Sequence, residues 1–221
     1  MTIELLYNTP LWVAAKAIRK CWASEDKSDT IIHSDEAYTK DIDGQMFRCE
    51  AGPKDKALIE RVGNKNKHAS TLEHLNYTFD IDGISRACLQ EVARHRHASI
   101  SVKSTRYTLK ELKTSDKRSF HKFLVETGDD LIDMTNLSRL KGIQVQLAYG
   151  TSNDIVKYML PEAYKTSLVW TINARSLQNF LSLRTNKAAL WEIRELAYQL
   201  YNRLPEEHKY LFFDSLYQEE K

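Results

Sequence analysis

Apolar and polar residues alternate strictly over 75–82, where the sequence reads LNYTFDID. A period of two places all the apolar side chains on one face, which predicts a half-buried strand, and Gly83 is expected to close it. A second alternating run over 167–173 predicts another strand, and a shorter extended piece is expected over 99–109. These stretches would supply the sheet of the fold.

Apolar residues at helical spacing predict that most of the remaining chain is helical. The first helix is expected over 11–22, with Thr9 as its cap and Pro10 in its first turn. The polar stretch 24–53 is expected to form a loop or a surface excursion. Further helices are expected over 54–62 (ended by Gly63), 84–96, 131–147, 153–160, 173–183 (capped by Asn173) and 190–204. Because the chain shows no repeat and no linker, the pattern predicts a helix-rich α+β fold in a single domain over 1–221.

Composition narrows the class of protein. The hydrophobic share of 42% and the charged share of 28% are typical of globular proteins, and the net charge is only +2. Such a balance argues against a nucleic-acid or membrane-surface protein, so neither partner is expected. Three widely spaced cysteines without a CxxC pair suit a reducing cytoplasm. Neither a signal peptide nor a membrane span is expected.

Glycine spacing excludes the common phosphate-binding loops. No two glycines are two residues apart, so no GxG exists, and the GxxxxGK loop is absent as well. These motifs hold phosphates through backbone N–H groups. If this protein binds a nucleotide, side chains must hold its phosphates.

One segment carries most of the chemistry-bearing residues. Residues 94–107 read RHRHASISVKSTRY, which crowds arginines, histidines, a lysine and hydroxylic residues together. Guanidinium groups pair with phosphate or carboxylate at two points, and hydroxyls add neutral donors. Arg94 and Arg96 would point in opposite directions if helical. The alternatives are a solvated basic helix end and a phosphate clamp without catalysis.

Two further clusters strengthen the functional interpretation. Residues 68–74 read HASTLEH directly before the first predicted strand, but they lack a third metal ligand, so no metal site is expected. Residues 173–184 read NARSLQNFLSLR, in which Arg175 and Asn179 share a helix face and Arg184 faces elsewhere. The apolar residues of this helix would face the core.

Together these motifs resemble the flavin-dependent thymidylate synthase (ThyX) family. Arg94-His95-Arg96, then seven residues and Ser104, is similar to the family's RHR-x7-S signature. HASTLEH and NARSLQNFLSLR resemble its other two elements, in the same order. The resemblance implies an antiparallel sheet flanked by long helices. It also implies a homotetramer that methylates dUMP to dTMP with methylenetetrahydrofolate, FAD and NADPH.

The resemblance also assigns roles residue by residue. It implies that FAD is bound by His68, Ser70, Arg94, His95, Arg96, Asn173, Arg175 and Asn179. It implies that dUMP is bound by Glu91, Arg94, Ser104, Arg106, Lys157 and Arg184. Arg184 is also expected to be catalytic, polarising the pyrimidine so that charge can develop on the ring.

Some positions depart from the family's pattern. Ser101 and Val102 stand where asparagine and glutamate are frequent, and Lys157 keeps a charge without the arginine fork. Cys88 is expected to be a small core residue rather than a thiolate nucleophile, and Ser104 has no evident base, so it is assigned to binding. A relative that had lost activity would lack Arg184 or Ser104, and both are present.

Overall fold

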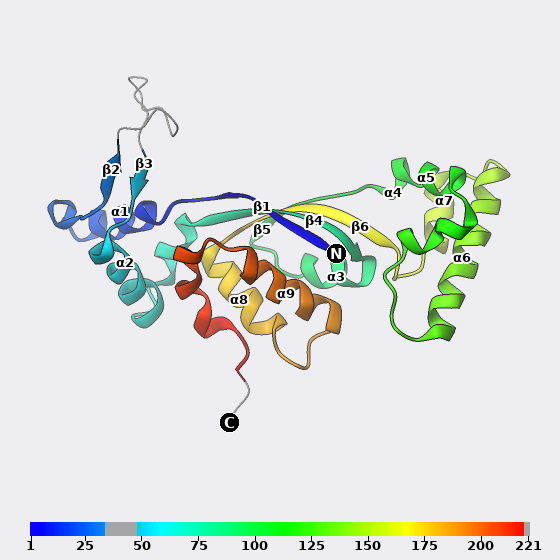
Figure 1. The fold of residues 1–221 in the computed structure, drawn as a ribbon. Coiled ribbons are helices and arrows are strands. Elements are labelled where there is room, and N and C mark those ends of the chain that lie inside the picture. Colours follow the sequence, from blue (N-terminus) through cyan, green and yellow to red (C-terminus); the bar gives the residue numbers. More distant parts are fainter. Residues whose placement is uncertain (34–47, 219–221) are drawn as a thin grey trace, which may run out of the picture. The chain divides into compact units, whose positions relative to one another are not determined.

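The structure, a computed structural model, describes residues 1–33 and 48–218. Its larger sheet has four antiparallel strands in the order β1-β4-β6-β5 (Figure 1). The predicted helix-rich α+β class with an antiparallel sheet is therefore confirmed. The four strands are β1 (Thr2–Asn8), β4 (Asn76–Ser85), β5 (Ala98–Val102) and β6 (Lys165–Asn173).

The chain divides into two compact units. The first comprises Met1–Glu4 and Asp80–Trp170, and the second comprises Leu5–Phe79 and Thr171–Lys221. Strands β1, β4 and β6 each run from one unit into the other. A single catalytic domain over 1–221 stays a prediction.

Both alternating runs form strands, and β4 is longer than predicted. Tyr77, Phe79 and Ile81 are fully buried along one face of β4, as their alternation predicted. Gly83 does not close the strand: it lies inside β4 with a φ of 80°, and the strand continues to Ser85. Glycine adopts this left-handed conformation without the steric penalty of a Cβ, which explains why the residue is tolerated within the strand.

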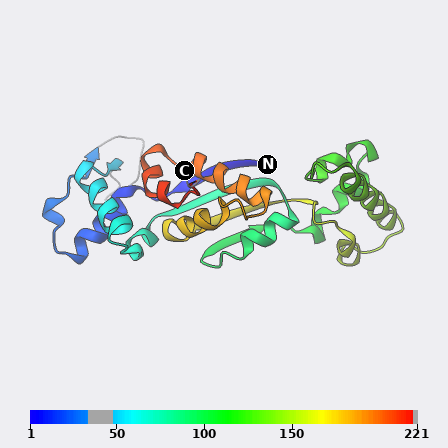
Figure 2. The same cartoon turned by 90° about the horizontal axis from the view of Figure 1, so that it is seen from below.

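The second unit holds four α-helices among its described residues. They are α1 (Leu11–Cys21), α2 (Pro53–Ile59), α8 (Ala174–Arg184) and α9 (Trp191–Arg203), and α8 lies beside α9 in both ribbon views (Figures 1 and 2). Leu177, Phe180 and Leu181 form the buried face of α8 as predicted. Shorter elements of this unit are η1 (Glu25–Lys27), β2 (Ile31–His33), β3 (Arg48–Glu50), η2 (Glu60–Lys65), η3 (Ala69–His74), η6 (Glu206–Leu211) and η7 (Phe213–Ser215).

Two predicted helix boundaries in this unit are wrong. Thr9 does not cap α1: Pro10 is the N-cap residue, and the Thr9 hydroxyl accepts from the Asn76 backbone N–H at 3.1 Å. Gly63 does not end the second helix, because α2 continues as the π-helical turn η2. A Cβ at Gly63 would lie 2.8 Å from Leu72 Cδ2, so glycine serves close packing here.

The predicted excursion 24–53 is tied to the second unit where it is described. The carboxylate of Asp55 accepts hydrogen bonds from Arg19 Nε at 2.5 Å, Ser28 Oγ at 2.6 Å and Thr30 Oγ1 at 2.8 Å. Burial alone would raise the pKa of Asp55, but these donors outweigh it and lower that pKa. Residues 34–47 of the excursion lie outside the described residues.

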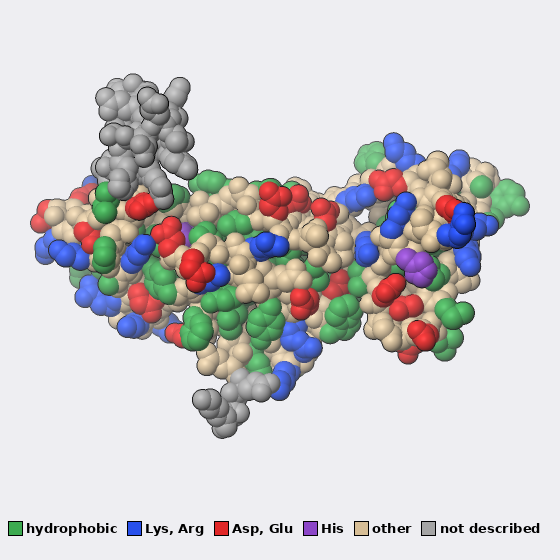
Figure 3. All heavy atoms as spheres, viewed as in Figure 1, with side chains coloured by type: hydrophobic (Ala, Val, Ile, Leu, Met, Phe, Trp, Pro, Cys, Tyr) green, Lys and Arg blue, Asp and Glu red, His purple; other side chains and the backbone are tan. Residues whose placement is uncertain are grey.

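The first unit carries a separate helical layer with its own core. Leu112, Phe120, Leu140 and Ile143 are fully buried in one cluster. On the face shown in Figure 3, basic and acidic side chains are interspersed over this layer. The layer's elements are α4 (Thr105–Thr108), α5 (Lys110–Thr114), η4 (Lys117–Phe123), α6 (Asp130–Ala148), α7 (Asn153–Val156) and η5 (Lys157–Met159). The remaining helix of this unit, α3 (Arg86–Ala93), directly follows β4.

Candidate functional site

The segment with the most basic residues follows α3 rather than belonging to it. Helix α3 ends at Ala93, so Arg94, His95 and Arg96 lie in the connection to β5, and the predicted helix to residue 96 is too long. The extended piece predicted over 99–109 is confirmed only as far as Val102, because α4 begins at Thr105.

The start of α3 is fixed by a local hydrogen bond. The Ser85 hydroxyl accepts from the Cys88 backbone N–H at 3.0 Å, which satisfies one of the free N–H groups of the first turn. At the other end, Arg94 Nη1 lies 3.9 Å from Glu91 Oε1, and Arg94 and Arg96 are exposed. Two predicted residues therefore contact each other, and the guanidinium groups of this connection are accessible to an anion.

Arg106 is held by residues that the sequence analysis missed. Its Nε donates to Asp154 Oδ1 at 2.7 Å and its Nη2 to Asp154 Oδ2 at 3.4 Å. Asn153 Nδ2 also donates to the Arg106 backbone oxygen at 2.6 Å. Both partners belong to α7, which packs against α4. The sequence offered only one indication, an acidic residue in the first turn of an expected helix.

The same short segment presents another predicted residue. Lys157 directly follows α7, half-buried, at the start of η5. Because α7 contacts both α4 and η5, the elements that carry Arg106 and Lys157 share α7 as a neighbour within the first unit. Ser104 is the exposed N-cap residue of α4. This part of the unit therefore offers two cations and a hydroxyl to an anionic ligand.

In the second unit, an ion pair joins the two other predicted clusters. Arg175 Nη1 donates to Glu73 Oε1 at 2.7 Å, and both side chains are about half exposed. Glu73 belongs to η3, which packs against α8. Glu73 is a further residue missing from the predicted site, although it lies within the HASTLEH motif.

Among the other predicted residues of this unit, Asn173 uses its side chain in a hydrogen bond within the protein, whereas three others have exposed side chains. Asn173 caps α8 as predicted, because its Oδ1 accepts from the Ser176 N–H at 2.9 Å. His68, Ser70 and Asn179 are exposed on η3 and α8 or directly before them. Their side chains are therefore accessible to a bound molecule.

Arg184 is the last residue of α8 and is half-buried. It follows Arg175 by nine residues, which in an α-helix of 3.6 residues per turn corresponds to about half a turn. The two guanidinium groups therefore leave α8 on opposite faces, as the sequence predicted. Among residues 1–33 and 48–218, no three His, Cys, Asp or Glu side chains gather in a way that would hold a metal ion.

Comparison with known proteins gives one consistent result. The family described as "Thymidylate synthase complementing protein" matches residues 4–208. The flavin-dependent thymidylate synthase of Wolinella succinogenes is 53% identical over 218 residues, covering 96% of this chain and 97% of that protein. The flavin-dependent thymidylate synthase of Campylobacter jejuni is also 53% identical, over 225 residues and 99% of both chains.

A solved structure agrees with these relatives. The crystal structure of thymidylate synthase X from Helicobacter pylori with FAD and dUMP superposes with a TM-score of 0.86 at 43% identity. The superposition covers 99% of this chain and 100% of the Helicobacter pylori chain.

Proposed function

The chain belongs to the flavin-dependent thymidylate synthase family, and from this premise we propose how its residues convert dUMP to dTMP. Methylenetetrahydrofolate is the proposed carbon donor and NADPH the proposed reductant, with FAD as the hydride carrier. Arg94, His95, Arg96, His68, Ser70, Asn173, Arg175 and Asn179 are the proposed FAD contacts. Glu91, Arg94, Ser104, Arg106, Lys157 and Arg184 are the proposed dUMP contacts.

The observation that carries the substrate assignment is the geometry of Arg106. Asp154 takes the Nε–Nη2 edge of the guanidinium. A guanidinium has five N–H donors, so the Nη1–Nη2 edge keeps donors for a second anion. An arginine fixed in this way, with Lys157 on η5 at the end of the same α7 that holds it, suits the phosphate of a nucleotide.

The exposed side chains also fit FAD. Its diphosphate needs cationic or N–H donors, and the sequence has no glycine-rich loop to supply them. Exposed Arg94, Arg96 and Arg175 provide guanidinium donors instead. When bound, FAD supplies the hydride, whereas the protein supplies position and charge.

The protein's own part in the chemistry falls to Arg184. Carbon 5 of uracil becomes nucleophilic only as negative charge develops on the ring. A fixed guanidinium placed against that charge stabilises it, and Arg184 is proposed for this role. Cys88 is fully buried in α3, which argues against a thiolate nucleophile, as the sequence analysis expected.

Absorbance spectroscopy of the purified protein tests this assignment. We expect a flavin band that bleaches when NADPH is added anaerobically, followed by dTMP once dUMP and methylenetetrahydrofolate are supplied. A colourless protein that takes up no added FAD would contradict the proposed contacts. Bleaching by NADPH without any dTMP would contradict the assignment of the carbon donor.

A homotetramer with shared sites is also proposed. Strand β5 lies at one edge of the sheet, and none of its five residues is buried. Ile100 is 39% and Val102 38% exposed, so this edge offers apolar side chains and free backbone groups to another subunit. Light scattering is expected to give four chains, and a monomer with full turnover would contradict the proposal.

The proposed location is the cytoplasm. None of the three cysteines is in a disulfide bond, which suits a reducing compartment. No described helix has the length and apolar character needed to cross a membrane. Cell fractionation with an antibody against the protein would test the location.

A further inference from the structure

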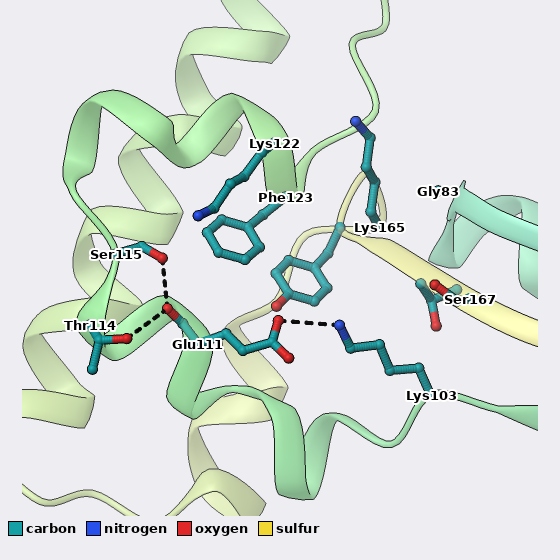
Figure 4. Close-up of a pocket in the computed structure, with 11 residues that line it drawn as sticks. Gly83, Lys103, Glu111, Thr114, Ser115, Lys122, Phe123, Lys165 and Ser167 are labelled. Carbon is teal, nitrogen blue, oxygen red and sulfur yellow. Dashed lines mark hydrogen bonds and ion pairs between the residues drawn. The ribbon is translucent and has the colours of Figure 1, made fainter. Parts of the chain in front are cut away.

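The first unit contains a pocket that none of the proposed FAD or dUMP contacts lines. Its volume is about 510 Å³, within the usual range for small-molecule sites. It lies between the helical layer and the start of β6, and Figure 4 shows the side chains around it. Lys103, Lys122 and Lys165 line it, together with one carboxylate, that of Glu111.

The charge of this lysine pocket favours an anion. Lys103 Nζ pairs with Glu111 Oε2 at 3.2 Å, so one positive charge is balanced and two remain. Within the part of the chain that the structure describes, Lys122 and Lys165 form no salt bridge. Tyr164 adds no negative charge, because burial, with a smaller contribution from Glu111, raises its pKa to about 12.

The wall between the lysines is aromatic. The rings of Phe123 and Tyr164 are parallel within 4°, with centroids 6.3 Å apart. Lys122 Nζ lies 4.9 Å from the centre of the Phe123 ring, and Figure 4 shows these two side chains next to each other. The pocket therefore combines an apolar face with ammonium groups, which suits a ligand that carries both a ring and carboxylates.

We propose that the lysine pocket binds the aminobenzoyl-glutamate tail of the folate co-substrate, and that its lysines favour tails of several γ-linked glutamates. This proposal rests on the proposed function, which names methylenetetrahydrofolate as the carbon donor. Lys103 joins the pocket to the substrate segment, because it directly precedes Ser104. Its backbone N–H donates to the Ser167 oxygen on β6 at 2.8 Å, which fixes that junction.

A phosphate of NADPH is another anion that lysines attract. The three lysines, however, come from separate segments: the loop after β5, η4 and the first residue of β6 (Figure 4). In Figure 4 the Lys165 side chain points away from Glu111. Ammonium groups spread in this way suit successive carboxylates along a chain better than one phosphate.

Steady-state kinetics with two forms of the co-substrate tests the proposal. KM is measured for methylenetetrahydrofolate with one and with three glutamates, in the wild type, K122A and K165A. We expect the longer tail to lower the wild-type KM about fivefold to tenfold, because its extra carboxylates would form one or two ion pairs that are partly screened by solvent. Each variant should lose most of this ratio, and K110A is the matched control.

The control variant K110A removes a lysine charge near the pocket without changing the pocket's lining. Lys110 lies on α5 beside Glu111, but it is exposed and does not line the pocket. K110A should therefore keep the wild-type ratio. A wild-type KM that does not depend on tail length would overturn the proposal. So would variants in which KM rises for NADPH, or equally for dUMP, while the tail-length ratio survives.

A binding measurement separates this proposal from the proposed function. Free tri-γ-glutamate is titrated into the intact protein by calorimetry, which requires no turnover. Weaker binding to K122A and K165A than to K110A supports the pocket, even if no dTMP is formed. Equal binding to all variants, or no binding to the wild type at millimolar concentration, rejects the pocket even if the enzyme is fully active.

Discussion

The Asp154 carboxylate accepts two hydrogen bonds from one edge of the Arg106 guanidinium, with Nε–Oδ1 and Nη2–Oδ2 distances of 2.7 and 3.4 Å. Exposed pairs of this kind contribute little to stability, typically below about 1 kcal/mol. The contact therefore matters mainly for orientation: it sets the direction in which the free edge of the guanidinium points.

We expect Asp154→Ala to raise KM for dUMP about fivefold with little change in kcat, because the guanidinium loses its fixed orientation. Asp154→Asn keeps one acceptor oxygen, so its KM for dUMP should lie between the values of the wild type and Asp154→Ala. The matched control is Asp116→Asn, which removes a similar exposed pair with Arg118 (2.9 Å) elsewhere in the first unit. If Asp154→Ala lowers KM instead, Asp154 competes with the substrate.

Arg184→Ala should keep bound flavin but reduce dTMP formation by at least about a hundredfold, the usual cost of removing a group that stabilises developing charge. The two functions separate because Arg184 and Arg175 leave α8 on opposite faces. Flavin absorbance and dTMP yield are measured on the same sample. Loss of the flavin band would show that Arg184 belongs to the cofactor contacts.

Cys88→Ala should change turnover by less than about twofold. The thiol is fully buried, and the substitution would cost about 1 kcal/mol of stability through lost packing. Thermal melting and dTMP formation are measured together. An inactive variant with a near-normal Tm would restore a nucleophilic role for this cysteine.

His208 should make the protein sensitive to mild acid. It is fully buried, its Nδ1 lies 2.8 Å from the Tyr77 hydroxyl, and no hydrogen-bond partner of its Nε2 exists in the described structure. Desolvation lowers its pKa from 6.5 to about 4. Because the folded protein then binds the proton more weakly than the unfolded chain, protonation favours unfolding.

The free energy of unfolding should therefore fall as pH drops from 6.5 to 4, with His208 accounting for up to about 3 kcal/mol of the loss. Urea unfolding at several pH values measures it. His208→Gln should show a flatter pH dependence, whereas His121→Gln, at an exposed position, should keep the wild-type slope. Equal slopes in all three proteins would exclude His208 as the sensor.

The sequence correctly predicted the strands and helices in which the spacing of apolar residues matches the face that the fold buries. Alternation identified β4 and β6, and apolar spacing identified α6, α8 and α9, because each has a buried face of regular period. The errors at Thr9 and Gly63 arise from contacts outside their own helices. Thr9 is engaged by Asn76, and Gly63 packs against Leu72, so neither acts through its own helix.

The residues of the candidate site also fall into two groups: those that sequence motifs reveal and those that only the fold brings together. Its motif residues were identified by order and spacing, whereas Asp154, Asn153 and Glu73 were missed. Asp154 is 48 residues from Arg106, and Glu73 is 102 residues from Arg175. No periodicity links positions that only meet through packing. The lysine pocket has the same origin, since its three lysines come from separate segments.

The hydrogen bond between Tyr77 and His208 has a consequence for synthesis of the chain on the ribosome. The two residues are 131 positions apart. At a translation rate of about 5–20 residues per second, Tyr77 emerges roughly 7–26 seconds before its partner. During that interval the ring of Tyr77 lacks both His208 and Phe212, the two late residues that pack against it, so this part of the core closes only after synthesis has passed residue 212.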